Sequence, residues 1–98
     1  MAKTLLSALL FLLTLSCFGQ KNYTISGTIK DAATGEQLIG ATVRIKQLPQ
    51  SGTITNGYGF YSIYAPEGEY TLLFTYTGYQ PIEKQVSLHQ NQNINIAL

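Results

Sequence analysis

The sequence predicts an all-β fold, a seven-stranded antiparallel β-sandwich of the Greek-key type that follows a cleaved signal peptide. After residue 20, apolar and polar side chains alternate with a period of two through most of the chain, as expected for strands with one buried and one solvent-facing side. Glycine, asparagine and proline separate the short alternating runs, and these residues favour turns. No stretch after residue 20 has the apolar spacing of a helix.

The N-terminal part of the domain contains two clear alternating runs. The first covers residues 23–30, where apolar residues and glycine occupy every second position. Residues 31–37 then supply an aspartate and a glycine, which favour a turn. The second run covers residues 41–46 and alternates alanine, valine and isoleucine with polar side chains. We expect Pro49 and Gly52 to break the chain after it.

A glycine turn follows a short third strand at residues 53–55 and is the most informative segment of the chain. Gly57 and Gly59 can adopt positive φ at little steric cost, and Asn56 tolerates it better than most residues. We therefore expect the chain to reverse in a tight hairpin and to form a fourth strand at residues 60–65. The side chains expected to point into the core from this strand are Tyr61, Ile63 and Ala65.

The C-terminal part of the domain is expected to hold three more strands. Residues 66–69 are read as a second hairpin turn, and Gly78 with Tyr79 as a further turn. The remaining strands are expected at residues 70–76, 82–88 and 94–98. The strongest inward stripe of the chain consists of Tyr70, Leu72, Phe74 and Tyr76. Short strands at intervals of roughly 8–12 residues, separated by turn residues, are typical of a β-sandwich.

Residues 1–19 have the features of a secretory signal peptide. Lys3 supplies the positive charge, residues 5–15 form an apolar run, and Cys17 and Gly19 are the small residues of a cleavage site. The apolar run is shorter than the roughly 20 residues that a membrane-spanning helix needs. An alternative is that Cys17 is lipidated and anchors the protein to a membrane.

Cleavage after Gly19 leaves residues 20–98 as one exported domain. This part has as many basic as acidic side chains and no cysteine. Because a nucleic-acid-binding protein needs a basic surface, the balance of charge argues against that function. Without disulfides, a domain of this size depends on packing for its stability, or on a neighbouring domain.

The sequence offers no catalytic or metal-binding set of residues. His89 is the only histidine, and no acidic residue adjoins it in the sequence. It is therefore expected to be a solvated turn residue, with no zinc site and no base for a serine nucleophile. Glu67 and Glu69 provide too few oxygens for calcium. We expect no cofactor, no metal and no enzymatic activity.

Exposed aromatic residues are the strongest candidates for a binding surface. Tyr58, Phe60 and Tyr64 are expected at the turn and on the outer side of the fourth strand, with Leu73 beside them on the next strand. Such an apolar patch often marks an interaction surface. The alternatives are that these side chains only stabilise the sheet as cross-strand pairs, or that they stack on sugar rings. The first or last strand, at a sheet edge, is a further route to a partner, with Lys84 guarding an edge.

Four segments resemble the carboxypeptidase regulatory-like domain, a small transthyretin-like β-sandwich. Ser26-Gly27-Thr28-Ile29 with Asp31 resembles its first strand and turn. Residues 34–43 are similar to its "tGepLpGAtV" segment, residues 55–63 to "TDxxGxFsI", and Gly78-Tyr79 to its "GY" turn. Asn56 stands where the family commonly has aspartate, which removes a negative charge.

This resemblance implies a function in protein interaction. A signal peptide followed directly by such a domain resembles the N-terminal extension of TonB-dependent outer-membrane nutrient receptors of Gram-negative bacteria, where a plug and a barrel follow. It therefore implies a periplasmic or outer-membrane location and a protein partner, including the remainder of a receptor chain. A separate surface or periplasmic carbohydrate-binding module is the alternative.

Overall fold

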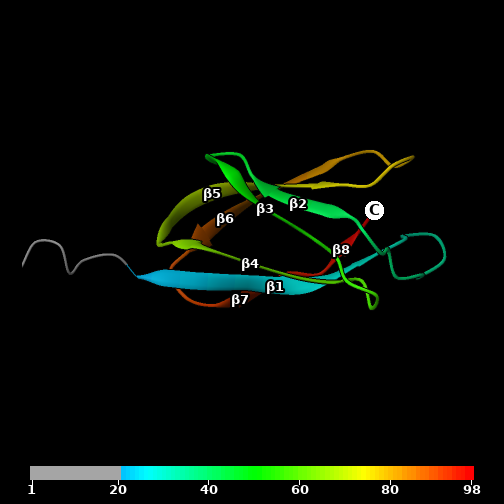
Figure 1. The fold of residues 1–98 in the computed structure, drawn as a ribbon, viewed down its shortest axis with the longest axis horizontal. Coiled ribbons are helices and arrows are strands. Elements are labelled where there is room, and N and C mark those ends of the chain that lie inside the picture. Colours follow the sequence, from blue (N-terminus) through cyan, green and yellow to red (C-terminus); the bar gives the residue numbers. More distant parts are fainter. Residues whose placement is uncertain (1–20) are drawn as a thin grey trace, which may run out of the picture.

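Two β-sheets face each other in a computed structural model that describes residues 21–98 (Figure 1). The signal peptide and the lipidation site expected within residues 1–19 lie outside the described residues. The strands are β1 (Asn22–Lys30), β2 (Thr42–Ile45), β3 (Leu48–Ile54), β4 (Phe60–Pro66), β5 (Gly68–Thr75), β6 (Ile82–Leu88), β7 (Gln92–Asn93) and β8 (Ile96–Ala97). The described part of the chain has no helix of the length and apolar character that crossing a membrane requires.

The sheet topology confirms the predicted sandwich and corrects two details of it. One sheet has the order β4-β1-β7, with β8 also paired to β1, and the other has the order β3-β2-β5-β6. The described residues form eight strands where seven were expected, because Gln92–Asn93 form the additional strand β7 ahead of the expected last strand, of which Ile96–Ala97 form β8. Both short strands run parallel to β1, so the sandwich is not wholly antiparallel.

Both predicted hairpin turns are crossings between the sheets. The turn at residues 56–59 joins β3 to β4, and Glu67 joins β4 to β5, yet these strand pairs belong to different sheets. The predicted turn at Gly78, by contrast, joins paired antiparallel strands, β5 and β6. The crossings have a physical reason, because they place the apolar stripes of β4 and β5 opposite each other instead of side by side.

The core lies between these two stripes. Tyr61, Ile63 and Ala65 of β4 are buried as predicted, and so are Leu72 and Phe74 of β5. The rings of Tyr61 and Phe74 meet edge to face, with centroids 5.8 Å apart and planes at 71°, a preferred geometry for aromatic pairs. At the ends of the predicted stripe, the side chains of Tyr70 and Tyr76 are only partly buried.

Every buried side-chain nitrogen or oxygen among residues 21–98 has a hydrogen-bond partner. Thr55, which is 2% exposed, donates its hydroxyl hydrogen to Leu38 O (2.6 Å) and accepts from Ala41 N (2.9 Å). Tyr61 donates its hydroxyl hydrogen to Ile94 O (2.7 Å), and burial raises the pKa of Tyr61 to about 12. These bonds join the two sheets to the loops that close them.

The strand edges differ from the expectation. β1 is not an edge strand, because it pairs with β4 on one side and with β7 and β8 on the other. Pro49 and Gly52 do not break the chain but lie within β3. Proline fits there because β3 is an edge strand, where one face of the backbone needs no partner. Lys84 is exposed on β6, which is also an edge strand.

Candidate interaction site

Asn56 organises the turn that leads into β4. Its side-chain Oδ1 accepts hydrogen bonds from Tyr58 N (2.9 Å) and Phe60 N (3.1 Å). Its backbone N–H donates to Phe60 O (2.9 Å), and its carbonyl accepts from Gly59 N (3.0 Å). Asn56 therefore holds the turn by hydrogen bonding, and its own φ is not positive.

Of the two glycines in this turn, only Gly59 has a positive φ, at 71°. A Cβ at Gly59 would also lie only 3.0 Å from Ile29 O, so the position requires glycine on steric grounds as well. Gly57 has neither a positive φ nor a neighbour within 4 Å of its Cβ position. Gly78 has a φ of 89° in the β5–β6 turn, where Tyr79 N donates to Tyr76 O.

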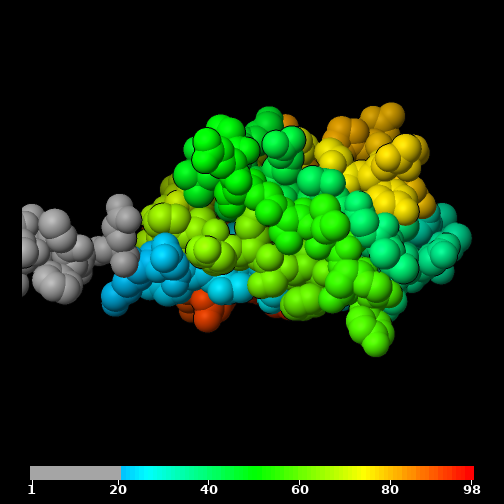
Figure 2. Space-filling view, in the orientation of Figure 1, coloured from blue at the N-terminus to red at the C-terminus, as the bar shows by residue number. Residues whose placement is uncertain are grey.

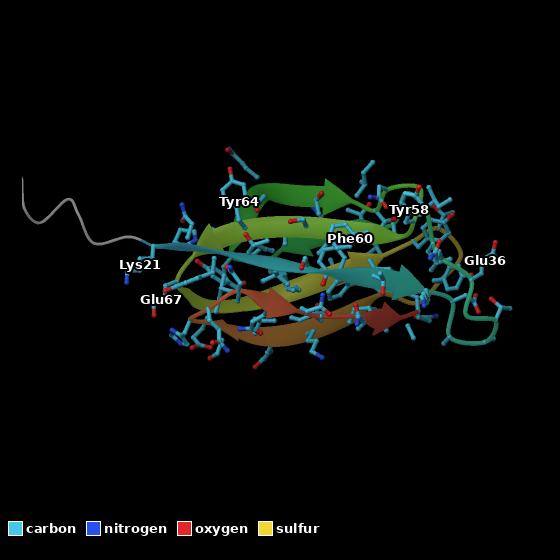
Figure 3. The ribbon with its side chains drawn as sticks, turned by 90° about the horizontal axis from the view of Figure 1, so that it is seen from below. Lys21, Glu36, Tyr58, Phe60, Tyr64 and Glu67 are labelled. Atoms are coloured by element: carbon cyan, nitrogen blue, oxygen red, sulfur yellow. The ribbon has the colours of Figure 1, made fainter. Side chains whose placement is uncertain are left out.

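Three predicted aromatic residues are exposed along β4 and its preceding turn (Figure 3). Tyr58 is 76% exposed, Tyr64 is 70% exposed and Phe60 is 40% exposed. Phe60 and Tyr64 lie on the outer side of β4, about 13 Å apart at the spacing of an extended strand. Ser62 lies between them, and their partners on β1 are threonines. The outer face of this sheet thus alternates aromatic and hydroxyl side chains.

Leu73 does not belong to this surface, contrary to the expectation. It lies on β5, in the other sheet, where its register partners are Arg44 on β2 and Glu83 on β6. The prediction failed because it assumed that β4 and β5 form a hairpin, whereas the chain crosses between the sheets after Pro66. The aromatic surface therefore consists of Tyr58, Phe60 and Tyr64.

An open groove lies beside this surface, between the edge strands of the two sheets. Residues 48–53 of β3 form one wall, and residues 62–64 of β4 form the other. Figure 2 shows β3, in green, and β4, in yellow-green, on the same face of the molecule. The groove has a volume of about 750 Å³, and none of its lining residues is charged. That volume is within the range of ligand-binding pockets.

The groove was missed at the level of sequence because Pro49 and Gly52 were interpreted as a break. Apolar and polar residues alternate only weakly over residues 48–54, so the sequence had no period-two pattern that would have indicated a strand there. A signal was present in Pro49 itself, since proline inside a strand marks an edge.

At the end of the sandwich near the Gly78 turn, Asp31 and Tyr79 form a contact between distant loops. Asp31 Oδ1 accepts hydrogen bonds from Ala33 N (2.8 Å) and Thr34 N (2.9 Å), and Oδ2 accepts from the Tyr79 hydroxyl (2.5 Å). The Tyr79 hydrogen bond and then the backbone bonds lower the pKa of Asp31 below its ordinary value of 3.8. This contact gives both "GY" residues a structural role.

We expect Tyr79→Phe to change how the stability of the protein depends on pH. A carboxyl group with a lowered pKa in the folded state stabilises the fold above its unfolded pKa, and this contribution is lost as the pH falls through the folded pKa. The difference in the free energy of unfolding between wild type and Tyr79→Phe should therefore be largest above pH 3.8, the ordinary pKa of an aspartate, and should decrease below that pH. Urea unfolding between pH 6 and pH 2 measures this difference. Tyr76→Phe, on the neighbouring ring, is the control and should show no such trend.

His89 has acidic neighbours in space, although none adjoins it in the sequence. Its Nδ1 lies 2.8 Å from Glu67 Oε1, and its Nε2 lies 3.4 Å from Glu69 Oε1. The hydrogen bond to Glu67 is the main cause that raises the pKa of His89. All three side chains are about half exposed or more, and residues 21–98 contain no group of three acidic, histidine or cysteine side chains placed to hold a metal ion. His89 is exposed in the bend after β6, in agreement with the solvated turn residue that was expected, and its acidic neighbours come from the preceding strand region.

Comparison with known proteins identifies the family. The profile of the CarboxypepD_reg-like domain matches residues 25–98, which is most of the chain. The chain belongs to the CarboxypepD_reg-like domain family. This confirms the resemblance drawn from the sequence. The matched region begins at Ile25 within β1 and includes all of the later strands of the CarboxypepD_reg-like sandwich. The comparison with curated proteins found no match.

A solved structure supports the fold of this CarboxypepD_reg-like domain. It is a chain of an N-terminal interface mutant of the type II cohesin–X-dockerin complex from Acetivibrio cellulolyticus, with a TM-score of 0.66 and 23% sequence identity. The similarity covers 76% of this chain and 52% of that chain, so this domain matches about half of the longer structure. At this identity the likeness shows a shared fold only.

Proposed function

We propose that this chain is a non-catalytic protein-interaction domain, exported to the periplasm or outer membrane, that forms the N-terminal extension of a TonB-dependent nutrient receptor. The observation that carries the interaction role is the set of exposed aromatic side chains Tyr58, Phe60 and Tyr64 beside an uncharged groove. Large exposed aromatic residues are enriched where proteins bind one another. The signal-like residues 1–19 support export.

Two further observations support this proposal. The domain belongs to the CarboxypepD_reg-like family, and its structural neighbour comes from a protein–protein complex. Both ring nitrogens of the only histidine, His89, face glutamates, so no serine or threonine hydroxyl of residues 21–98 is paired with it as a nucleophile would be.

We expect Phe60→Ser combined with Tyr64→Ser to remove partner binding while the fold remains intact. Both side chains are exposed, so their loss should change stability little. The measurement is cross-linking of the full-length protein in cells, followed by recovery of the cross-linked receptor or partner, with thermal unfolding of each variant. Leu73→Ser, on the outer face of the other sheet, is the matched control. Loss of the fold in the double variant would instead show that these aromatic residues serve only to stabilise the sheet.

The location and context are tested on the native protein. An antibody against the domain should recover from the outer-membrane fraction a polypeptide that lacks residues 1–19 and continues beyond Leu98 into a plug and a barrel. Recovery of a polypeptide ending at Leu98 would contradict the receptor assignment. A fatty-acylated N-terminus at Cys17 would replace signal cleavage with lipid anchoring.

Carbohydrate binding is a second candidate, favoured by one observation. Phe60 and Tyr64 flank Ser62 on a sheet face that also carries Thr24 and Thr28, so flat rings and hydroxyl groups alternate as they would beside a sugar chain. A glycan-binding screen separates the two functions. Saturable binding that the Phe60→Ser and Tyr64→Ser changes abolish would favour the carbohydrate function.

A further inference from the structure

Of the strand edges in residues 21–98, that of β4 has the fewest of the features that prevent strand addition in natural proteins. Such features are charged side chains, proline, bulges and very short strands. β6 carries exposed Glu83 and Lys84, β3 contains Pro49 and pairs with β2 through a register shift, and β7 and β8 have two residues each. β4 has seven residues, no charge and a regular register with β1 throughout, and its one proline, Pro66, is the last residue of the strand.

The hydrogen bonds at the two ends of the β1–β4 ladder show which backbone groups of β4 face its free edge. Ile29 N donates to Gly59 O and Glu67 N donates to Lys21 O, both at 2.9 Å. In an antiparallel pair, bonded residues recur at every second position. The odd-numbered residues of β4 therefore bond to β1. The residues whose backbone groups point to the free edge are Phe60, Ser62, Tyr64 and Pro66.

Two of these four residues are already capped. Both backbone groups of Phe60 are bonded to Asn56. Pro66 has no N–H, and its carbonyl accepts from the Tyr70 hydroxyl (2.7 Å). Ser62 and Tyr64 form no backbone hydrogen bond on this edge with any described residue. The free edge is thus limited to two N–H and two C=O groups in the middle of the strand.

The uncharged groove lies directly beside these four groups. Ser62 and Tyr64 are among its lining residues, and residues 48–53 of β3 form the opposite wall. A strand added to β4 would occupy the groove and extend the sheet. Its alternate side chains would point inward over Ile63 and Leu48, which are apolar, and outward beside Tyr64.

We propose that β4 binds, by strand addition, a short extended segment of another protein that is uncharged and carries apolar side chains at alternate positions. This inference rests on the proposed interaction function and names the chemistry of the partner. The uncharged walls require an uncharged occupant, because a charge buried there would lack a counterion. Backbone hydrogen bonds to Ser62 and Tyr64 would supply affinity, as in other strand-addition complexes.

A peptide segment fits this edge better than a second copy of the domain. Pairing through the edge groups of Ser62 and Tyr64 offers only four backbone hydrogen bonds, whereas a stable interface between folded proteins has about ten and buries about 1,600 Å². The wall formed by β3 also recesses the groove, which suits a single strand.

The test uses a displayed library of random seven-residue segments, selected on the wild-type protein and then measured as synthetic peptides. Ser62→Pro removes an N–H from the free edge without affecting the bonds to β1. The control is Gln85→Pro on the edge strand β6. Because Lys46 N donates to Thr71 O, the odd-numbered residues of β6 also face a free edge, so this change removes an equivalent N–H elsewhere.

We expect the selected peptides to be uncharged, with apolar residues at alternate positions. They should bind the Ser62→Pro variant about tenfold more weakly than the Gln85→Pro variant, which corresponds to about 1.4 kcal/mol of binding free energy. Methylating the peptide amides that face β4 should abolish binding, while methylating the alternate amides should not. Failure to select any peptide, equal binding to both proline variants, or equal effects of the two methylation patterns would each overturn strand addition.

The outcome separates this inference from the proposed function. If Phe60→Ser with Tyr64→Ser loses its partner but Ser62→Pro keeps it, the interaction function stands and strand addition at β4 is wrong. If the protein instead forms a concentration-dependent dimer in sedimentation that Ser62→Pro dissociates, the occupant is a second copy and the proposed peptide segment is wrong.

Discussion

Phe74→Ala should destabilise the protein by about 3–5 kcal/mol, the range for truncating a buried aromatic residue. Phe74 is fully buried near the C-terminal end of β5 and packs edge to face against Tyr61 from the other sheet. Its loss would leave a cavity where the two sheets meet and would remove this aromatic contact. Since a domain of this size has a stability on the order of 5–10 kcal/mol, the substitution should remove about a third or more of the free energy of unfolding.

Equilibrium unfolding in urea, followed by circular dichroism, measures the effect of Phe74→Ala. Tyr58→Ala is the matched control, because it truncates an aromatic side chain that is 76% exposed and should change stability by less than about 0.5 kcal/mol. A cooperative transition for Phe74→Ala that coincides with the control would show that the two sheets do not pack through this ring.

Gly27→Ala should have an effect of about 3 kcal/mol or more, the upper end for overpacking. A Cβ at Gly27 would lie 1.9 Å from Ile94 O and 2.6 Å from Ile94 C, which are backbone atoms. The segment between β7 and β8 would therefore have to move away from β1. That movement would break the hydrogen bonds from Ile94 N to Ser26 O and from the Tyr61 hydroxyl to Ile94 O.

Gly52→Ala is the control for this substitution. A Cβ at Gly52 in β3 would meet its nearest atom, Val43 O, at 3.6 Å, which is an ordinary contact. Amide hydrogen exchange should show loss of protection at Ile94 and Leu98 in Gly27→Ala and little change in Gly52→Ala. Equal stability of the two variants would indicate that the C-terminal segment is not held closely against β1.

Period-two alternation was sufficient to predict which side chains form the core. Tyr61, Ile63 and Ala65 point inward as expected, and so do Leu72 and Phe74. Alternation reports which face of a strand is buried, but it carries no information on which strand lies beside it. The family resemblance was also sound, because it depended on turn residues whose spacing the fold requires.

The errors in pairing β3 with β4 and β4 with β5 share one cause, which is the assumption that a tight turn joins neighbours within a sheet. The turns after Thr55 and Pro66 satisfy that description locally but lead from one sheet to the other. Leu73 was assigned to the wrong surface for this reason. By contrast, the true hairpin centred on Gly78 fixes a register in which His89 falls beside Glu67, so the contact between them was predictable from the sequence.

The position of β1 at the centre of its sheet has a consequence for how the domain is made. Apart from a single bridge between Lys30 and Gln37, β1 finds its partners among residues 60–97. These pairings span long sequence separations, which slow folding. In the exported protein that we propose, β1 would have no neighbouring strand until residues 60–66 had also crossed the membrane, so the sandwich would be completed only on the far side.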